Sequence, residues 1–328
     1  MKALIKTAIL ATTLVTGMIS VSSVQAETLL KFAHAAPESD LQQDLAKFFK
    51  SEVEKRSKGE IKVNIFPHGQ LGNDEQMIDG VRSGIIDIEM SGLNNFSGMV
   101  PESAAFTLPF MFPSRETAYK VLDGEVGKAT AKKFEKFGMK GLGFPENGYR
   151  NISNNRGPIK TPTDLKGLRM RVNNSVALNN MFSVLKANPQ QIPVAELYTA
   201  LETGVVDAQD HPIGVVLSFK FFEVQKYLSL SQHAYSPLIV VMNLNKFNAL
   251  PQDQQKIISE VSAESVQMQR KLSIAKEEEM LSDLTAKGMK INRDVDGGAF
   301  QKVVKPVWAK FIETNGDSLI NSILAASK

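Results

Sequence analysis

The sequence predicts an α/β fold of two lobes, with a parallel or mixed sheet and helices on its faces. Apolar segments that switch between strand and helix periodicity follow one another from Leu29 onward, which is the βαβα order of a sheet covered by helices. The chain has 328 residues, a length at which one hydrophobic core usually divides into two. A helix-favouring run from Pro251 to about Lys287 contains no Gly or Pro between Gln252 and Ala286, so it is long enough to cross both lobes.

The first part of the chain predicts strands and helices in alternation. Leu41, Leu45, Phe48, Phe49 and Val53 have helical spacing, whereas Ile61, Val63 and Ile65 alternate with polar residues as in a half-buried strand. We therefore expect strands at Leu29 to Ala33, Ile61 to Ile65 and Ile85 to Met90, a helix at Ser39 to Ser57, and a second helix capped by Asn73.

The second part continues this order. One helix is expected from Ser114 to about Phe137, and Thr161-Pro162-Thr163-Asp164 has the cap, proline and acid of a helix start. Leu168 to Val172 predicts a strand with both of its arginines on one face. Further helices are expected at Ser175 to Leu185 and Val194 to Glu202, and further strands at Gly141 to Phe144, Tyr227 to Leu230 and Leu238 to Met242.

Residues 1–26 have the pattern of a cleaved signal peptide. Lys2 and Lys6 precede a short apolar stretch, and small residues at Val24 and Ala26 mark a cleavage site. The remaining 302 residues carry a formal charge of +1 and no cysteine, so neither a disulfide nor an N-terminal lipid anchor is expected. No later segment is apolar enough for stable membrane insertion. An exported, diffusible protein is retained only inside an outer membrane, which predicts the periplasm of a Gram-negative cell.

The composition gives little support to several function classes. The near-neutral charge and the absence of a basic block argue against nucleic-acid binding. The four histidines lack zinc spacing, and neither a G-x-S-x-G elbow nor a dinucleotide-binding glycine loop is present. We therefore expect no cofactor and no enzymatic activity, although an acid–base pair among the 35 Asp and Glu residues remains an alternative.

Four segments carry a family resemblance. They are Phe66 to Ile88 (FPHGQLGNDEQMIDGVRSGIIDI), Pro101 to Phe112 (PESAAFTLPFMF), Glu146 to Asn174 (ENGYRNISNNRGPIKTPTDLKGLRMRVNN) and Pro193 to Pro212 (PVAELYTALETGVVDAQDHP). In order and spacing they resemble the solute-binding subunits of tripartite ATP-independent periplasmic (TRAP) transporters, the DctP-like family. The resemblance covers essentially the whole chain beyond residue 26.

The resemblance implies a periplasmic binding protein fold in which strands hinge the two lobes and the long helix runs along both. Lobe I is expected to comprise residues 27–148 and 237–276, and lobe II residues 149–236 and 277–328. The implied partners are a small carboxylate ligand and the small and large membrane subunits of a permease driven by sodium gradients. The ligand is expected to close the lobes.

The resemblance also implies the site residues. Arg171 matches the carboxylate-clamping arginine of the family, and Arg150 matches a frequent second arginine. Asn147, Asn174, Gln209 and His211 fall in segments that line the family's cleft. The residue type supports Arg171 independently, because a guanidinium pairs with a carboxylate through two parallel hydrogen bonds and keeps its proton.

Two departures from the family pattern bear on the ligand. Many members read GQENP where this chain has Ala208 to Pro212 (AQDHP), and many carry Phe where this chain has Val194. No particular ligand is therefore carried over. The polar candidates favour a sugar acid such as a uronate or an aldonate. The alternatives are a C4-dicarboxylate held by Arg150 and Arg171, a ligand sensor for a membrane receptor, and a periplasmic lyase or isomerase.

His211 is the candidate for ligand selection. A neutral imidazole offers one donor and one acceptor to a ligand hydroxyl. An ordinary histidine titrates near pH 6.5, so contact with the ligand predicts an affinity that changes between about pH 5.5 and 8.

Overall fold

The structure is a computed structural model that describes residues 27–327, so the predicted leader at residues 1–26 lies outside the described part. The described strands form one mixed sheet in the order β2-β1-β3-β9-β5-β8-β6-β7, with β4 and β10 paired to β9. The strands are β1 (Thr28–His34), β2 (Ile61–Phe66), β3 (Ile88–Gly92), β4 (Met139–Gly143), β5 (Glu146–Asn154), β6 (Arg169–Val172), β7 (Asn188–Gln191), β8 (Ala208–His211), β9 (Tyr227–Asn243) and β10 (Lys290–Asn292).

Lobe I, as the name is used here, contains β1 to β3 with helices α1 (Leu41–Arg56) and α2 (Asp74–Ser83). β1 pairs in parallel with β2 and β3. Asp40 caps α1 by accepting from the backbone N–H of Gln42, and Asn73 forms a reciprocal capping box with Gln76 at the start of α2. The apolar faces of α1 and of the three strands enclose one core. The strand and helix order predicted for this region is confirmed.

Lobe II contains β6 to β8 with helices α5 (Val176–Val184), α6 (Val194–Glu202) and α7 (Ile213–Ser218). β6 pairs in parallel with β7 and β8, and β8 pairs antiparallel with β5. The predicted start at Thr161 is a capping box that opens a short 3₁₀ turn over Pro162–Leu165. The strand predicted at Leu168 to Val172 and the helices predicted at Ser175 to Leu185 and Val194 to Glu202 are confirmed as β6, α5 and α6.

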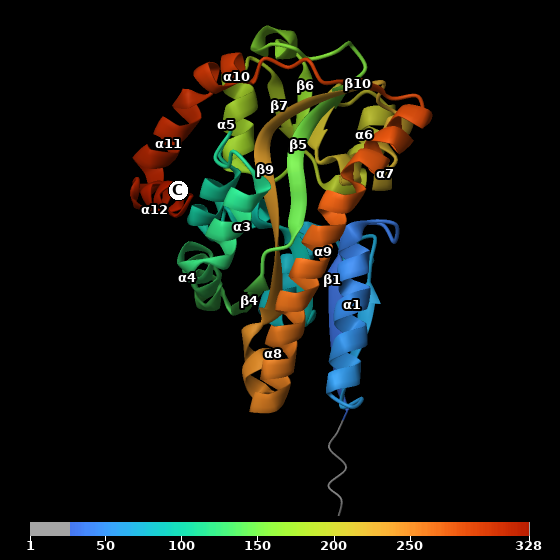
Figure 1. The fold of residues 1–328 in the computed structure, drawn as a ribbon, viewed down its shortest axis with the longest axis vertical. Coiled ribbons are helices and arrows are strands. Elements are labelled where there is room, and N and C mark those ends of the chain that lie inside the picture. Colours follow the sequence, from blue (N-terminus) through green and yellow to red (C-terminus); the bar gives the residue numbers. More distant parts are fainter. Residues whose placement is uncertain (1–26, 328) are drawn as a thin grey trace, which may run out of the picture.

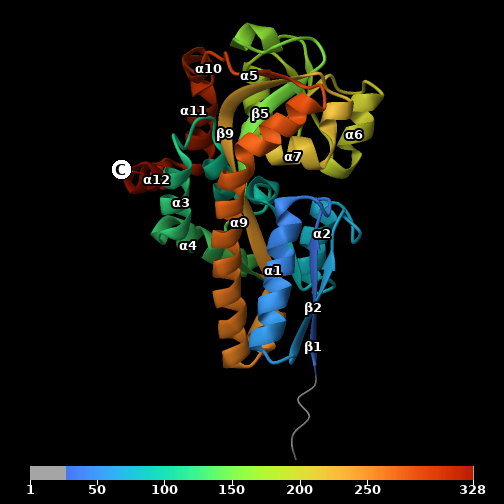
Figure 2. The same cartoon turned by 45° about the vertical axis from the view of Figure 1, so that its right-hand side comes forward.

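Strands β5 and β9 and helix α9 (Gln252–Ala286) join the lobes (Figure 1). β9 pairs with β3 and β4 at one end and with β5 and β10 at the other. Helix α9 (Gln252–Ala286) has 35 residues and packs on α1 of lobe I and α7 of lobe II, as Figure 2 shows. At 1.5 Å per residue it is about 50 Å long. Each predicted exchange point between lobes falls inside β5, β9 or α9; the boundaries themselves remain a prediction.

Two predictions about element continuity are wrong. The helix expected from Ser114 to Phe137 is divided into α3 (Arg115–Asp123), α4 (Glu125–Lys133) and a 3₁₀ turn (Phe134–Phe137). Gly124 is extended, and Gly127 lies so close to the Leu122 carbonyl that any side chain there would collide with it. The strands expected at Tyr227 to Leu230 and Leu238 to Met242 are one strand, β9, because Ala234 to Pro237 between them pair with β5, past a register shift near Gln232.

The C-terminal helices were not predicted. They are α10 (Gly297–Val303), α11 (Lys305–Asn315) and α12 (Ser318–Ala326), and a short α8 (Leu244–Ala249) precedes α9. α11 packs on α5 of lobe II, but α12 packs on α3 and α4. The chain thus ends against residues expected in lobe I. No helix within residues 27–327 is both long enough and apolar enough to cross a membrane.

Candidate ligand-binding cleft

A cleft lies between the two lobes, where strands of both end. Its inner pocket is about 50 Å³ and is lined by Asn147, Arg150, Arg171 and His211 among others. An outer cavity of about 220 Å³ is also lined by Arg171, together with Asn174. The two spaces share several lining residues and therefore form one cleft. Five of the six site residues expected from the sequence line it; Gln209 does not.

Arg171, on β6, is the central cation of the cleft. Its side chain is only 1% exposed. Nε donates to the backbone carbonyl of Ile192 at 2.8 Å, and Nη1 lies 3.2 Å from Nε2 of His211. Unlike Arg150, it forms no ion pair with a carboxylate of residues 27–327. Burial, with the nearby charge of Arg150, lowers the pKa of Arg171 to about 10, so it remains a cation at neutral pH. A buried arginine without an anion is costly unless a ligand supplies one.

Arg150, on β5, already has its anion. Its Nε and Nη2 donate to the two carboxylate oxygens of Asp210 at 2.6 and 3.1 Å, and both side chains are at most 1% exposed. Nε2 of His233 lies 3.1 Å from the same carboxylate. Burial alone would raise the pKa of Asp210, but Arg150 and His233 hold it well below its usual range. The pair is therefore neutralised within the protein.

His211, on β8, has both ring nitrogens engaged. Nδ1 lies within hydrogen-bonding distance of Oε1 of Gln209, an atom that only accepts. Nδ1 therefore donates, and Nε2 accepts from Arg171. Nε2 of Gln209 donates to Ser153 at 2.6 Å, and Ser153 donates to Gln225. Burial, with Arg150 and Arg171, lowers the pKa of His211 well below its ordinary value. Direct, pH-dependent contact between His211 and the ligand stays a prediction, but both ring nitrogens have protein partners and the two arginines oppose protonation of the ring.

A comparison of pH profiles checks this. We expect affinity for the preferred acid to have the same pH dependence from about pH 5.5 to 8 in the wild type and in His211→Asn, because a neutral ring exchanges no proton on binding. The variant is expected to bind more weakly at every pH, since it no longer orients Arg171. Calorimetric titrations at several pH values measure both quantities. A pH dependence that disappears in His211→Asn would contradict a permanently neutral His211.

Hydrogen bonds cross the mouth of the cleft. Nδ2 of Asn174 donates to Glu75 of α2 at 2.9 Å, and the Asn174 carbonyl accepts from Ser97 at 3.3 Å. At the back, Ser218 of α7 donates to Asp40 at 2.6 Å. Asn174 thus joins the lobes across the outer cavity, and the structure has the cleft closed.

Lobe I contributes acids and neutral polar groups that the sequence analysis did not single out. Asp74 opens α2 and lines both parts of the cleft; burial, against the opposing charge of Arg171, raises its pKa to about 6. Glu89 is fully buried on β3 near Asp74. Its burial, together with the negative charge of Asp74, raises the pKa of Glu89 well above its usual range. Ser91 and Asn94 follow on the same segment. The signal that could have identified them is position, since ligands of α/β sheets gather at strand ends.

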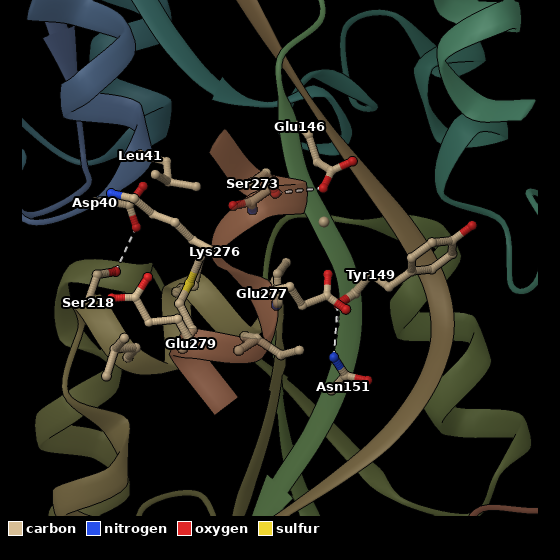
Figure 3. Close-up of a pocket in the computed structure, with 18 of the residues that line it drawn as sticks. Asp40, Leu41, Glu146, Tyr149, Asn151, Ser218, Ser273, Lys276, Glu277 and Glu279 are labelled. Atoms are coloured by element: carbon tan, nitrogen blue, oxygen red, sulfur yellow. Dashed lines mark hydrogen bonds between the residues drawn. The ribbon is translucent and has the colours of Figure 1, made fainter. Parts of the chain in front are cut away.

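A second cavity of about 230 Å³ lies behind the cleft, among β5, α7, α9 and the start of α1 (Figure 3). Its lining has more acids than bases, including Asp40, Glu279 and Asp283. Arg115, which also lines it, is already paired with Glu146 and Glu277. This cavity therefore repels carboxylates, and we assign an anionic ligand to the cleft that holds Arg171.

Two lobes joined by hinge strands around a buried arginine define the class of two-lobed solute-binding proteins. Residues 32–315 match the family model DctP, described as bacterial extracellular solute-binding protein, family 7. The chain belongs to this family and is a TRAP-type solute-binding protein.

Three similar proteins illustrate its relatives. The 2,3-diketo-L-gulonate-binding periplasmic protein YiaO of Escherichia coli K12 is 44% identical over 92% of each chain. The sugar acid binding protein DctPAm of Advenella mimigardefordensis, solved with galactonate, is 32% identical with a TM-score of 0.89, covering 92% of this chain and 98% of that one. A TRAP solute-binding protein of Sulfurospirillum deleyianum, solved with succinate, is 31% identical with a TM-score of 0.87, covering 92% and 99%.

Proposed function

We propose that this protein captures a monocarboxylic sugar acid, a uronate or an aldonate, in the periplasm after its leader is removed, and delivers it to the small and large membrane subunits of a TRAP permease. The ligand carboxylate pairs with Arg171. The observation that carries the proposal is that Arg171 is buried in the cleft without a carboxylate partner among residues 27–327.

The charges of the cleft favour one carboxylate over two. The alternative C4-dicarboxylate needs a second cation, and Arg150 was its candidate. Asp210 already neutralises Arg150, and the described lobe I residues that line the cleft include the acids Asp74 and Glu75 and no base. A second carboxylate there would be desolvated without a counter-charge, which is unfavourable. A hydroxylated tail meets no such penalty.

The expected site residues then have distinct roles. Arg171 binds the carboxylate, and Asn147 donates to or accepts from the ligand in the inner pocket. Gln209 and His211 act indirectly by orienting Arg171. Arg150 with Asp210 forms the rigid floor beside it. Asn174 holds the lobes together over the ligand.

Binding rather than catalysis is the favoured role. In the described lining of the inner pocket, the titratable groups besides the two arginines are His211, whose two nitrogens are engaged, and Asp74, so a single carboxyl is left to act as acid or base. A sensor for a membrane receptor would bind its ligand in the same way. Genes for two membrane subunits beside this one would favour transport, and a histidine kinase gene would favour sensing.

A thermal-shift screen against a panel of uronates, aldonates and dicarboxylates tests the proposal. A ligand that binds only the folded protein stabilises it by about 2.7 kcal/mol when the ligand concentration is 100 times the Kd, and this stabilisation raises the Tm. We expect the largest shifts with polyhydroxylated monocarboxylates. Shifts with dicarboxylates alone would support the alternative, and unaltered Tm values across the panel would contradict both.

A further inference from the structure

The inner pocket contains buried oxygens that have no hydrogen-bond partner within residues 27–327. They are Oγ of Ser91, Oδ1 of Asn94 and Oδ1 of Asn173. Ser91 is 3% exposed and Asn94 is fully buried, and all three residues line the pocket that contains Arg171. Buried polar atoms are nearly always paired, so three unpaired ones around a single cavity indicate a ligand that completes them.

The orientation of the Asn94 amide is fixed by its neighbours. Nδ2 donates to Oδ1 of Asn95 at 3.1 Å, which leaves Oδ1 as the unpaired atom. Gly92 provides the space, because a Cβ at that position would lie 2.8 Å from Asn94 Oδ1. The local chain thus holds an acceptor in the pocket.

These atoms specify the chemistry of their partner. Two amide oxygens only accept, and a serine hydroxyl accepts or donates. They therefore require O–H or N–H donors. A carboxylate has no donor and would face two carbonyl oxygens. A chain of hydroxyl groups satisfies all three.

We propose that Ser91 and Asn94 of lobe I, with Asn173 across the pocket, are specificity residues that bind the tail hydroxyls of the acid whose carboxylate pairs with Arg171. The inference rests on the proposed function and extends it by fixing the ligand's orientation: the carboxylate lies on lobe II and the hydroxylated tail on lobe I. Binding then connects the two lobes through one molecule, which favours the closed cleft.

Calorimetry with two acids of equal chain length tests the inference. D-galactonate has hydroxyls along its tail, whereas 2-hydroxyhexanoate keeps only the carboxylate and the first hydroxyl. We expect Ser91→Ala and Asn94→Leu each to weaken galactonate binding by about tenfold, the effect of losing one ligand hydrogen bond, and to leave 2-hydroxyhexanoate binding unchanged. Gly92→Ala should act like Asn94→Leu, because it displaces the amide.

Ser103→Ala is the matched control. Ser103 is also fully buried and its hydroxyl has no partner within residues 27–327, but it does not line the pocket. Its replacement should therefore alter the affinity of neither acid. A Tm within a few degrees of wild type identifies variants that fold.

The outcomes separate the two proposals. If galactonate binding requires Arg171 but both acids lose affinity equally in the Ser91 and Asn94 variants, or neither acid loses any, the specificity inference is overturned and the proposed function stands. Should galactonate, galacturonate and glucuronate all fail to bind the wild type, both are overturned.

Discussion

Replacement of Arg171 by alanine or lysine is expected to reduce affinity for the preferred acid by about 30-fold to several thousand-fold, corresponding to the roughly 2–5 kcal/mol lost when a desolvated charge pair is broken. Lysine is not expected to rescue binding, because an ammonium cannot reproduce the two parallel hydrogen bonds of a guanidinium. Isothermal titration calorimetry measures the loss directly. Both Arg171 variants are expected to fold, because Arg171 has no carboxylate partner in the described chain that its replacement would leave unpaired.

Arg169→Ala is the control for this experiment. Arg169 lies on the same strand two residues away, but its side chain is 45% exposed and pairs with Asp207 outside the cleft. We expect the Arg169→Ala variant to bind the acid with the same affinity as the wild type. Affinity that is nearly unaltered in both Arg171 variants would show that the carboxylate lies elsewhere.

The largest expected effect on stability comes from Asp210→Asn. The substitution keeps the shape of the side chain but leaves the buried Arg150 without its anion, beside Arg171. Removing one member of a buried pair costs about 3–5 kcal/mol. Urea unfolding followed by circular dichroism at neutral pH should show a lower midpoint with a similar slope.

Asp207→Asn provides the comparison on the neighbouring surface. Asp207 also pairs with an arginine, but the side chains of that pair are 35% and 45% exposed. Exposed ion pairs contribute about 0–1 kcal/mol, so this variant should unfold close to the wild type. Equal losses of stability in the two variants would contradict the prediction that the buried Arg150–Asp210 pair contributes more to stability than the exposed Arg169–Asp207 pair.

Much of the architecture followed from local patterns, since caps and apolar periodicity act within a few residues. Asn73 does begin α2, and the stretch free of Gly and Pro is the single helix α9. Elements whose conformation or position depends on residues distant in sequence could not be predicted from local patterns. Ala234 to Pro237 continue the strand because they pair with β5 beyond an irregularity at Gln232, whose φ is positive, and nothing local indicates that α12 packs on α3 and α4.

The candidate site divides in the same way. The motifs around Arg150 and Arg171 identified the cation side of the cleft, because residue type and family spacing both mark it. The difference between the two arginines was not readable, since it depends on Asp210 lying 2.6 Å from Arg150 across neighbouring strands. Ser91 and Asn94 of lobe I stand in no recognised motif, and only the structure identifies them, as buried oxygens that have no partner in the described part of the chain.

A titration of the wild-type protein with D-galactonate, D-galacturonate and succinate under identical conditions tests whether the cleft binds a monocarboxylic sugar acid in preference to a dicarboxylate. We expect at least one of the two sugar acids to bind in a 1:1 ratio and more tightly than succinate by about 30-fold or more, since a second buried carboxylate without a counter-charge costs roughly 2 kcal/mol or more. Succinate binding that equals or exceeds that of both sugar acids would contradict it.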